Sequence, residues 1–172
     1  MNRVRATRLI GSSFGLVFVQ ANAGALPDPV AIPLRVLAVA AFLVLGVFNR
    51  RPAPEETTAA PTPGFGGRYW LVVAAEVVGI AVGLAVINKA LHTPTATVGW
   101  IAFVVGVHFF GLATAWSRPQ LRVLGGSMAA CGAAGMTLAF LGAPAAAVST
   151  VAGILPGAFL FASVWWSSRT TA

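Results

Sequence analysis

The amino-acid sequence predicts an all-α fold, a polytopic transmembrane helical bundle of about six transmembrane helices with N and C termini cytoplasmic. Of the 172 residues, 58% are hydrophobic and only 9% are charged, whereas a soluble domain usually carries about 25% charged residues. A chain of this length has too little interior to bury so much apolar surface, and a lipid environment accounts for it. The apolar residues also fall into six runs, each close to the ~20 residues that cross ~30 Å of hydrocarbon.

The six runs are expected to be membrane-spanning helices of a single membrane domain, residues 1–172. In chain order they are 9–26, 30–48, 69–88, 98–116, 123–141 and 145–166. The segment 49–68 is rich in Pro and Gly and is expected to be a flexible cytoplasmic loop. Pro156 lies inside the sixth run, where it is expected to kink the helix.

The first run has two interpretations. A basic start, an apolar stretch and small residues around Ala23 are also typical of a cleaved signal peptide, whose removal would leave five spans. We expect residues 1–25 to be retained as a helix, because the apolar run continues past the possible cleavage sites. Gln20 and Asn22 are also the kind of polar residue that faces neighbouring helices in a bundle.

The placement of arginine predicts the orientation, since basic residues concentrate on the cytoplasmic side. The opposite connections carry only Asp28, Lys89 and His92. Trp100 and Trp116 lie near opposite ends of the fourth run, where indole rings prefer the membrane interface. The Arg-rich ends are expected to contact anionic lipid headgroups, and nucleic acid is not an expected partner because the basic residues form no patch with interleaved aromatics. The arginines at predicted cytoplasmic ends are Arg3, Arg5, Arg8, Arg50, Arg51, Arg68, Arg118, Arg122 and Arg169.

Polar side chains inside apolar runs are costly in hydrocarbon, so they are the candidate functional residues. Glu76 and His108 each lie about 10–12 Å from the cytoplasmic end of their runs at 1.5 Å per residue. Their runs are consecutive and antiparallel, so the two side chains could meet and hold or pass a proton. The simplest interpretation is a structural pair that fixes helix register; a proton- or ion-handling site and a ligand site are the alternatives.

A second polar group is expected in the outer half of the first two runs. It comprises Gln20, Asn22 and Arg35, brought together by the tight turn around Asp28. Arg35 could extend outward to Asp28 or to lipid headgroups, or it could face inward to Gln20.

No catalytic residue, metal site or cofactor is predicted. A single cysteine, Cys131, cannot form an internal disulfide, and Glu76 with His108 lacks the third ligand of a metal site. The sequence also contains no HExxH or P-loop pattern.

Glycines four residues apart predict faces on which helices approach closely in lipid. Two such pairs are Gly79 with Gly83 and Gly153 with Gly157. The fifth run is also rich in glycine, and such faces could support a homo-oligomer.

The middle of the chain carries Gly67-Arg68-Tyr69-Trp70, then Glu76 and Trp100, then the segment Gly106-Val107-His108-Phe109-Phe110-Gly111-Leu112-Ala113. This arrangement resembles a family of uncharacterised small multi-helix integral membrane proteins of bacteria, with an actinobacterial-like composition. The resemblance implies a bacterial membrane protein without an assigned activity.

Three functions remain open at this point. The first is a non-enzymatic helical bundle or accessory protein of the bacterial plasma membrane. The second is a small transporter or channel that handles protons or small solutes through Glu76 and His108. The third is a membrane-embedded enzyme acting on a lipid, which short outer loops and the lack of a nucleophile–base set disfavour.

Overall fold

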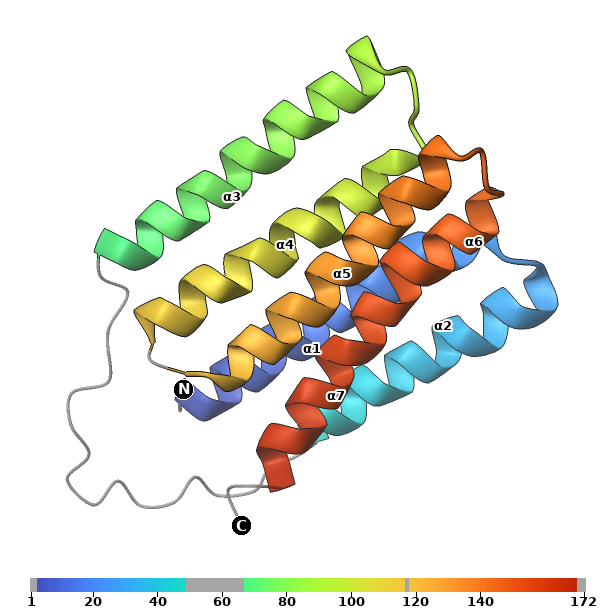
Figure 1. Ribbon diagram of the computed structural model, residues 1–172. Helices are drawn as coiled ribbons and strands as arrows, with labels where there is room; N and C mark the ends of the chain where they lie inside the picture. Colours follow the sequence, from blue (N-terminus) through green and yellow to red (C-terminus); the bar gives the residue numbers. More distant parts are fainter. Residues whose placement is uncertain (1–2, 49–66, 117, 170–172) are drawn as a thin grey trace, which may run out of the picture. The chain divides into compact units, whose positions relative to one another are not determined.

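The computed structural model describes residues 3–48, 67–116 and 118–169, and within these ranges the chain is helical with short turns and no strand (Figure 1). Residues 49–66, which make up most of the expected loop, lie outside the described part. The predicted helical class is confirmed, with six helices in the described ranges. They are α1 (Arg3–Asn22), α2 (Asp28–Phe42), α3 (Gly67–Ala85), α4 (Ala96–Ala115), α5 (Gln120–Phe140) and a last helix formed by α6 (Ala145–Ser149) and α7 (Leu155–Arg169).

Five of these helices are long and apolar enough to cross a membrane, so the chain has the make-up of a multi-pass membrane protein. Helix α1 does not qualify, because Arg8, Ser12, Gln20 and Asn22 interrupt its apolar sequence. Six helices were predicted to span, and five meet the requirement within the described residues. These five segments are Asp28–Phe48, Tyr69–Ala90, Ala96–Ala115, Gln120–Phe140 and Ala145–Ser167.

Three of these five helices contain a wide π-helical turn. Two of these turns extend the ends of α2 and α3, at Leu43–Phe48 and Val86–Ala90. The third, Thr150–Ile154, joins α6 to α7 just before Pro156. Proline has no N–H to donate to the carbonyl four residues earlier, and its ring clashes with that carbonyl, so a wider turn relieves the contact. This turn lies at the position where the kink at Pro156 was expected.

Helix α5 ends in a Schellman motif. Gly142 has a φ of +75°, which glycine adopts without steric strain. The Gly142 amide donates to the carbonyl of Ala139 at 3.1 Å, and the Ala143 amide donates to that of Leu138 at 2.9 Å. Pro144 follows as the residue that precedes α6, so the chain reverses here into the last helix.

The chain forms two compact units. The first contains residues 1–60 and 154–172, with α1, α2 and α7; the second contains residues 61–153, with α3, α4, α5 and α6. Each is described below by itself.

In the first unit, small residues bring α1 close to α7. A Cβ atom added to Gly157 would lie 3.0 Å from the Gly15 carbonyl oxygen, and one added to Gly11 would lie 2.9 Å from Val164. Helix α1 also contacts the end of α2, where Gly46 lies against the Ser12 side chain. Gly153, the partner of Gly157 in the predicted pair, is the last residue of the second unit and is buried in the π-helical turn before α7.

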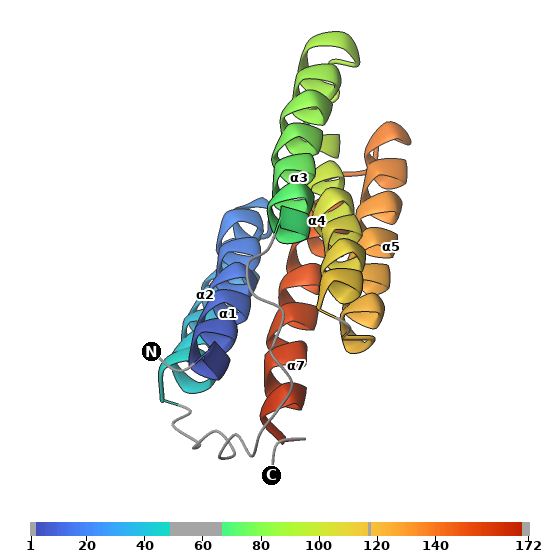
Figure 2. The ribbon, with the colours of Figure 1, turned by 90° about the vertical axis from the view of Figure 1, so that its left-hand side faces the viewer.

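In the second unit, α4 and α5 are in backbone contact (Figures 1 and 2). A Cβ added to Gly106 would lie 2.8 Å from the Gly125 carbonyl oxygen, and one added to Gly125 would lie 2.7 Å from the Gly106 carbonyl oxygen. Gly99 and Gly132 form the same reciprocal contact, at 2.8 and 2.7 Å. These approaches are shorter than a real Cβ tolerates, so the two helices meet at this distance only because both positions are glycine.

We predict that Gly106→Ala destabilises the protein whereas Gly126→Ala does not. Both changes gain helix propensity, worth up to about 1 kcal/mol. At Gly106 the new methyl would meet the α5 backbone, and such overpacking typically costs about 1–3 kcal/mol. At Gly126 it would meet only Phe110 at 3.7 Å. Thermal unfolding of the purified protein in detergent measures both; equal midpoints for the two variants would contradict the backbone contact.

Candidate intramembrane polar site

Helix α3 packs on the side of α4 that faces away from α5, so that α4 stands between them in both views of the second unit (Figures 1 and 2). The Trp100 side chain of α4 lies directly over Gly83, and its Nε1–H donates to the carbonyl oxygen of Gly79 at 3.1 Å. Nearer the other end of the helix pair, Gly111 of α4 lies against the side chain of Val72. These contacts at two levels fix how far α3 is shifted along α4.

Between these two levels, Glu76 of α3 and His108 of α4 meet. The His108 Nδ1 atom lies 3.1 Å from the Glu76 Oε2 atom, and the side chains are 11% and 19% exposed, respectively. Nδ1 is buried, and its approach to the carboxylate falls short of hydrogen-bond alignment. The contact is therefore a close electrostatic pair.

The pair lines a groove of about 460 Å³ between α3 and α4. Most of the lining is apolar, with Val72 and Ala75 from α3 and Val104, Val107 and Phe110 from α4. Besides Glu76 and His108, the polar lining residue is Thr114, whose hydroxyl donates to the Phe110 carbonyl oxygen of its own helix at 3.1 Å. The groove therefore presents one carboxylate and one imidazole on otherwise apolar walls.

A carboxylate and an imidazole at this distance can share one proton. If His108 carries it, the pair is an ion pair; if Glu76 carries it, both groups are neutral. In either arrangement the site has no net charge, which limits the cost of placing it among apolar walls. Loss of the proton leaves an uncompensated negative charge, and that charge would attract a proton or another cation.

The second predicted polar group lies in the first unit and is arranged differently. The Gln20 amide donates to the Arg35 backbone carbonyl at 3.1 Å. The Arg35 side chain is exposed, and its guanidinium lies beside Gly24 in the turn between α1 and α2. The Asn22 amide donates to the Phe18 carbonyl of its own helix at 2.8 Å and is buried. The contact of Arg35 with Gln20 is thus made by its backbone carbonyl, while its guanidinium lies at the turn.

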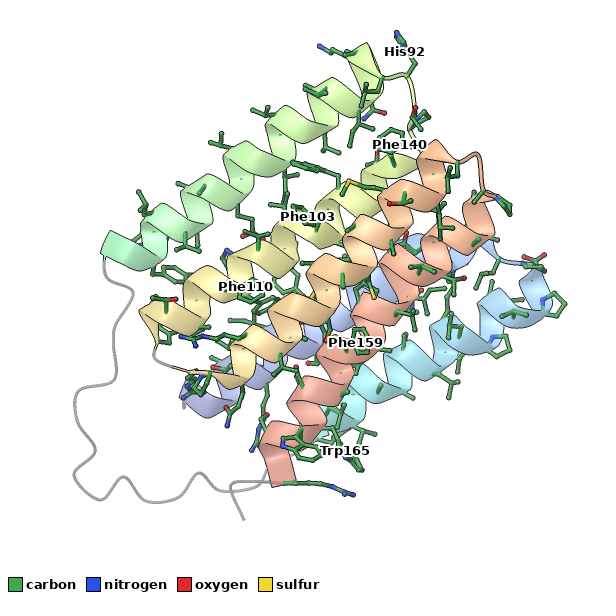
Figure 3. All side chains as sticks on the ribbon, in the orientation of Figure 1. His92, Phe103, Phe110, Phe140, Phe159 and Trp165 are labelled. Atoms are coloured by element: carbon green, nitrogen blue, oxygen red, sulfur yellow. The ribbon has the colours of Figure 1, made fainter. Side chains whose placement is uncertain are left out.

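Within the described residues, no group of three His, Cys, Asp or Glu side chains is close enough to hold a metal ion. The second histidine, His92, is not part of the groove. It lies in the turn that joins α3 to α4, far along α4 from Phe110 of the groove (Figure 3). Cys131 is half-buried in α5.

Two features of the site were not predicted from the sequence. One is the role of Trp100 as the residue that holds α3 on α4. The other is the backbone contact of Gly99 and Gly106 with α5, which places His108 on the opposite face. The seven-residue spacing of Gly99 to Gly106, repeated in Gly125 to Gly132, is the signal that could have revealed it.

We found no matching family model, no matching curated protein and no matching solved structure. The resemblance noted from the sequence therefore stays a prediction, and the functional interpretation below depends on the residues and their geometry.

We predict that Glu76 and His108 are energetically coupled in the folded protein. A double-mutant cycle of Glu76→Gln and His108→Ala should give a coupling free energy of about 0.5–1.5 kcal/mol, in the lower half of the usual range because both side chains are partly exposed. Denaturant unfolding in mixed micelles measures it. As a control, Thr137→Ala on α5, whose hydroxyl bonds only to its own helix at Ala133, should be additive with His108→Ala. A cycle that closes without coupling would rule out the contact.

Proposed function

We propose that this chain is a small multi-pass transporter or channel of the bacterial plasma membrane that binds and passes protons at Glu76 and His108. The observation that carries the proposal is the 3.1 Å contact between the imidazole and the carboxylate on two neighbouring helices that are each long and apolar enough to span a membrane. Ionisable residues at such positions are rare and usually mark an ion or proton path.

The surroundings of the pair support this role. A pair that served packing alone would be enclosed by side chains, whereas Glu76 and His108 line a groove with room for water or a solute. Histidine changes charge near neutral pH, and a carboxylate partner gives the proton a second place to reside. The proton can thus enter and leave without a permanently unpaired charge.

The arginine pattern supports an orientation with both termini cytoplasmic. Under this orientation, Glu76 and His108 lie in the cytoplasmic half of their helices, about 10–12 Å from the interface by helix rise. The same arrangement places the Arg-rich ends against the anionic headgroups of the cytoplasmic leaflet.

We predict that proteoliposomes containing the wild-type protein carry a proton flux that Glu76→Gln and His108→Ala each reduce at least about tenfold, as expected when a proton relay loses a member. The measurement is quenching of a pH-sensitive dye inside the vesicles after an imposed pH gradient. The matched control is Asn88→Ala, which removes an amide from the π-helical turn after α3. This amide bonds to Leu84 and Thr97 and does not line the groove.

Equal flux in the wild type and in both variants would remove Glu76 and His108 from any transport mechanism. The pair would then be a structural contact. Absence of flux in the wild type as well would favour the alternative of a non-enzymatic accessory bundle.

The orientation has its own test. A fluorescent reporter fused after Ala172 should fold and fluoresce in the cytoplasm, and a periplasm-active phosphatase inserted after Gly142, in the turn between α5 and α6, should be active. Activity of the phosphatase at Ala172 would contradict the proposed orientation. This outcome does not depend on whether residues 1–25 are cleaved, since the order of the remaining helices is unchanged.

A further inference from the structure

We propose that the groove between α3 and α4 binds an organic ammonium cation with an apolar body, and that this cation displaces the proton held by Glu76 and His108. The inference rests on the proposed function, because it takes the same pair as the proton site. It adds the chemical class of solute that the groove accepts.

The walls of the groove are mostly apolar. A volume of about 460 Å³ is in the range of small-molecule sites, which are mostly apolar with a few convergent polar groups. Here the apolar groups come from both helices and include the Phe110 ring, which is 41% exposed. An apolar body in contact with these walls is removed from water, and an aromatic face also attracts a cation.

The charge of the groove favours a cation. Glu76 is the one carboxylate among the groove-lining residues, and it is opposed there by no permanent cation. The titratable side chains described elsewhere on α3, α4 and α5 and in their connecting turns do not line the groove. They are Tyr69, Lys89, His92, Arg118, Arg122 and Cys131. With neutral His108, the Glu76 carboxylate can therefore pair with an ammonium group.

Other occupants fit the groove less well. An anion would meet the Glu76 carboxylate. A neutral acyl chain would leave the carboxylate and the imidazole against hydrocarbon without a partner, which is costly. A small metal ion would find one carboxylate and one imidazole, fewer ligands than such ions take. An ammonium ion with an apolar body satisfies both the walls and the carboxylate.

The exchange balances in charge. Before binding, Glu76 and His108 together hold one proton and carry no net charge. The cation pairs with the Glu76 carboxylate, and the proton leaves to water, so His108 is neutral and the loaded site again has no net charge. If the proton stayed, the loaded site would hold a net positive charge among apolar walls, which is strongly disfavoured.

The test uses the purified full-length chain in detergent with benzyltrimethylammonium as the probe. Equilibrium dialysis measures binding of the labelled cation, and a pH indicator in weak buffer measures proton release. We expect about one proton to be released per cation bound. Once the pair is protonated, the affinity should fall about tenfold for each unit by which the pH is lowered. Glu76→Gln should weaken binding at least about tenfold, whereas His108→Ala should still bind the cation but release far fewer protons.

Two matched compounds separate charge from shape in the wild type itself. Neopentylbenzene has the same shape without the charge, and tetramethylammonium has the charge without the ring. Both should displace the label much less well than unlabelled benzyltrimethylammonium does. Displacement by neopentylbenzene as efficient as that by the cation would overturn the proposal, as would binding without proton release or unchanged binding in Glu76→Gln.

These outcomes are distinguishable from failure of the proposed function. Proton flux without cation binding would rule out the cation as a ligand of the groove and would still support the proton path. Cation binding with proton release, but without flux in vesicles, supports the exchange site and rejects transport.

Discussion

The backbone contact between α4 and α5 is the constraint on which the candidate site depends. Gly106 and Gly99 hold one face of α4 against Gly125 and Gly132. His108 follows Gly106 by two residues, a rotation of about 200° around the helix axis. Fixing the glycine against α5 therefore turns the imidazole toward the opposite side, where α3 lies. In the Gly-Val-His segment of α4, Gly106 therefore packs against α5 and His108 faces the groove.

Helix α3 is held by fewer contacts than its neighbour. Of its most apolar 18-residue window, 11% is buried, compared with 44% for α4. Val77, Val78 and Val82 are 61, 60 and 57% exposed, as expected for side chains that face lipid. Glu76 lies on the face of α3 that packs against α4. The groove thus lies beside the most weakly packed helix of the second unit, and regions with few buried contacts are the ones that move most readily.

Hydropathy located the five helices that are long and apolar enough to span, because a bilayer requires long apolar segments whose backbone is hydrogen-bonded internally. It also marked most of α1, but this helix begins at Arg3 and is not apolar enough to qualify. The meeting of Glu76 and His108 followed from helix rise and the antiparallel order of adjacent helices. The groove could not be predicted from the sequence, since it depends on the directions in which Val72, Val104 and Phe110 project between the two helices. The role of Trp100 was hidden because an indole near a helix end is expected at the membrane interface, whereas here it donates to a carbonyl of α3. Arg35 was ambiguous because a long flexible side chain can reach in either direction.

The geometry also bears on whether the Glu76–His108 pair is structural or functional. If the pair were structural, its role would be to set the register of neighbouring helices. Glycine contacts already set the register of α4 on α5. The register of α3 on α4 is set by Trp100 on Gly83 and by Val72 on Gly111, on either side of the pair. Partly buried charge pairs contribute little net stability, because desolvation offsets their attraction. The pair is therefore not needed to set helix register, and its net contribution to stability is small. A use for its charge, through the proton that it holds beside the groove, is the simpler explanation.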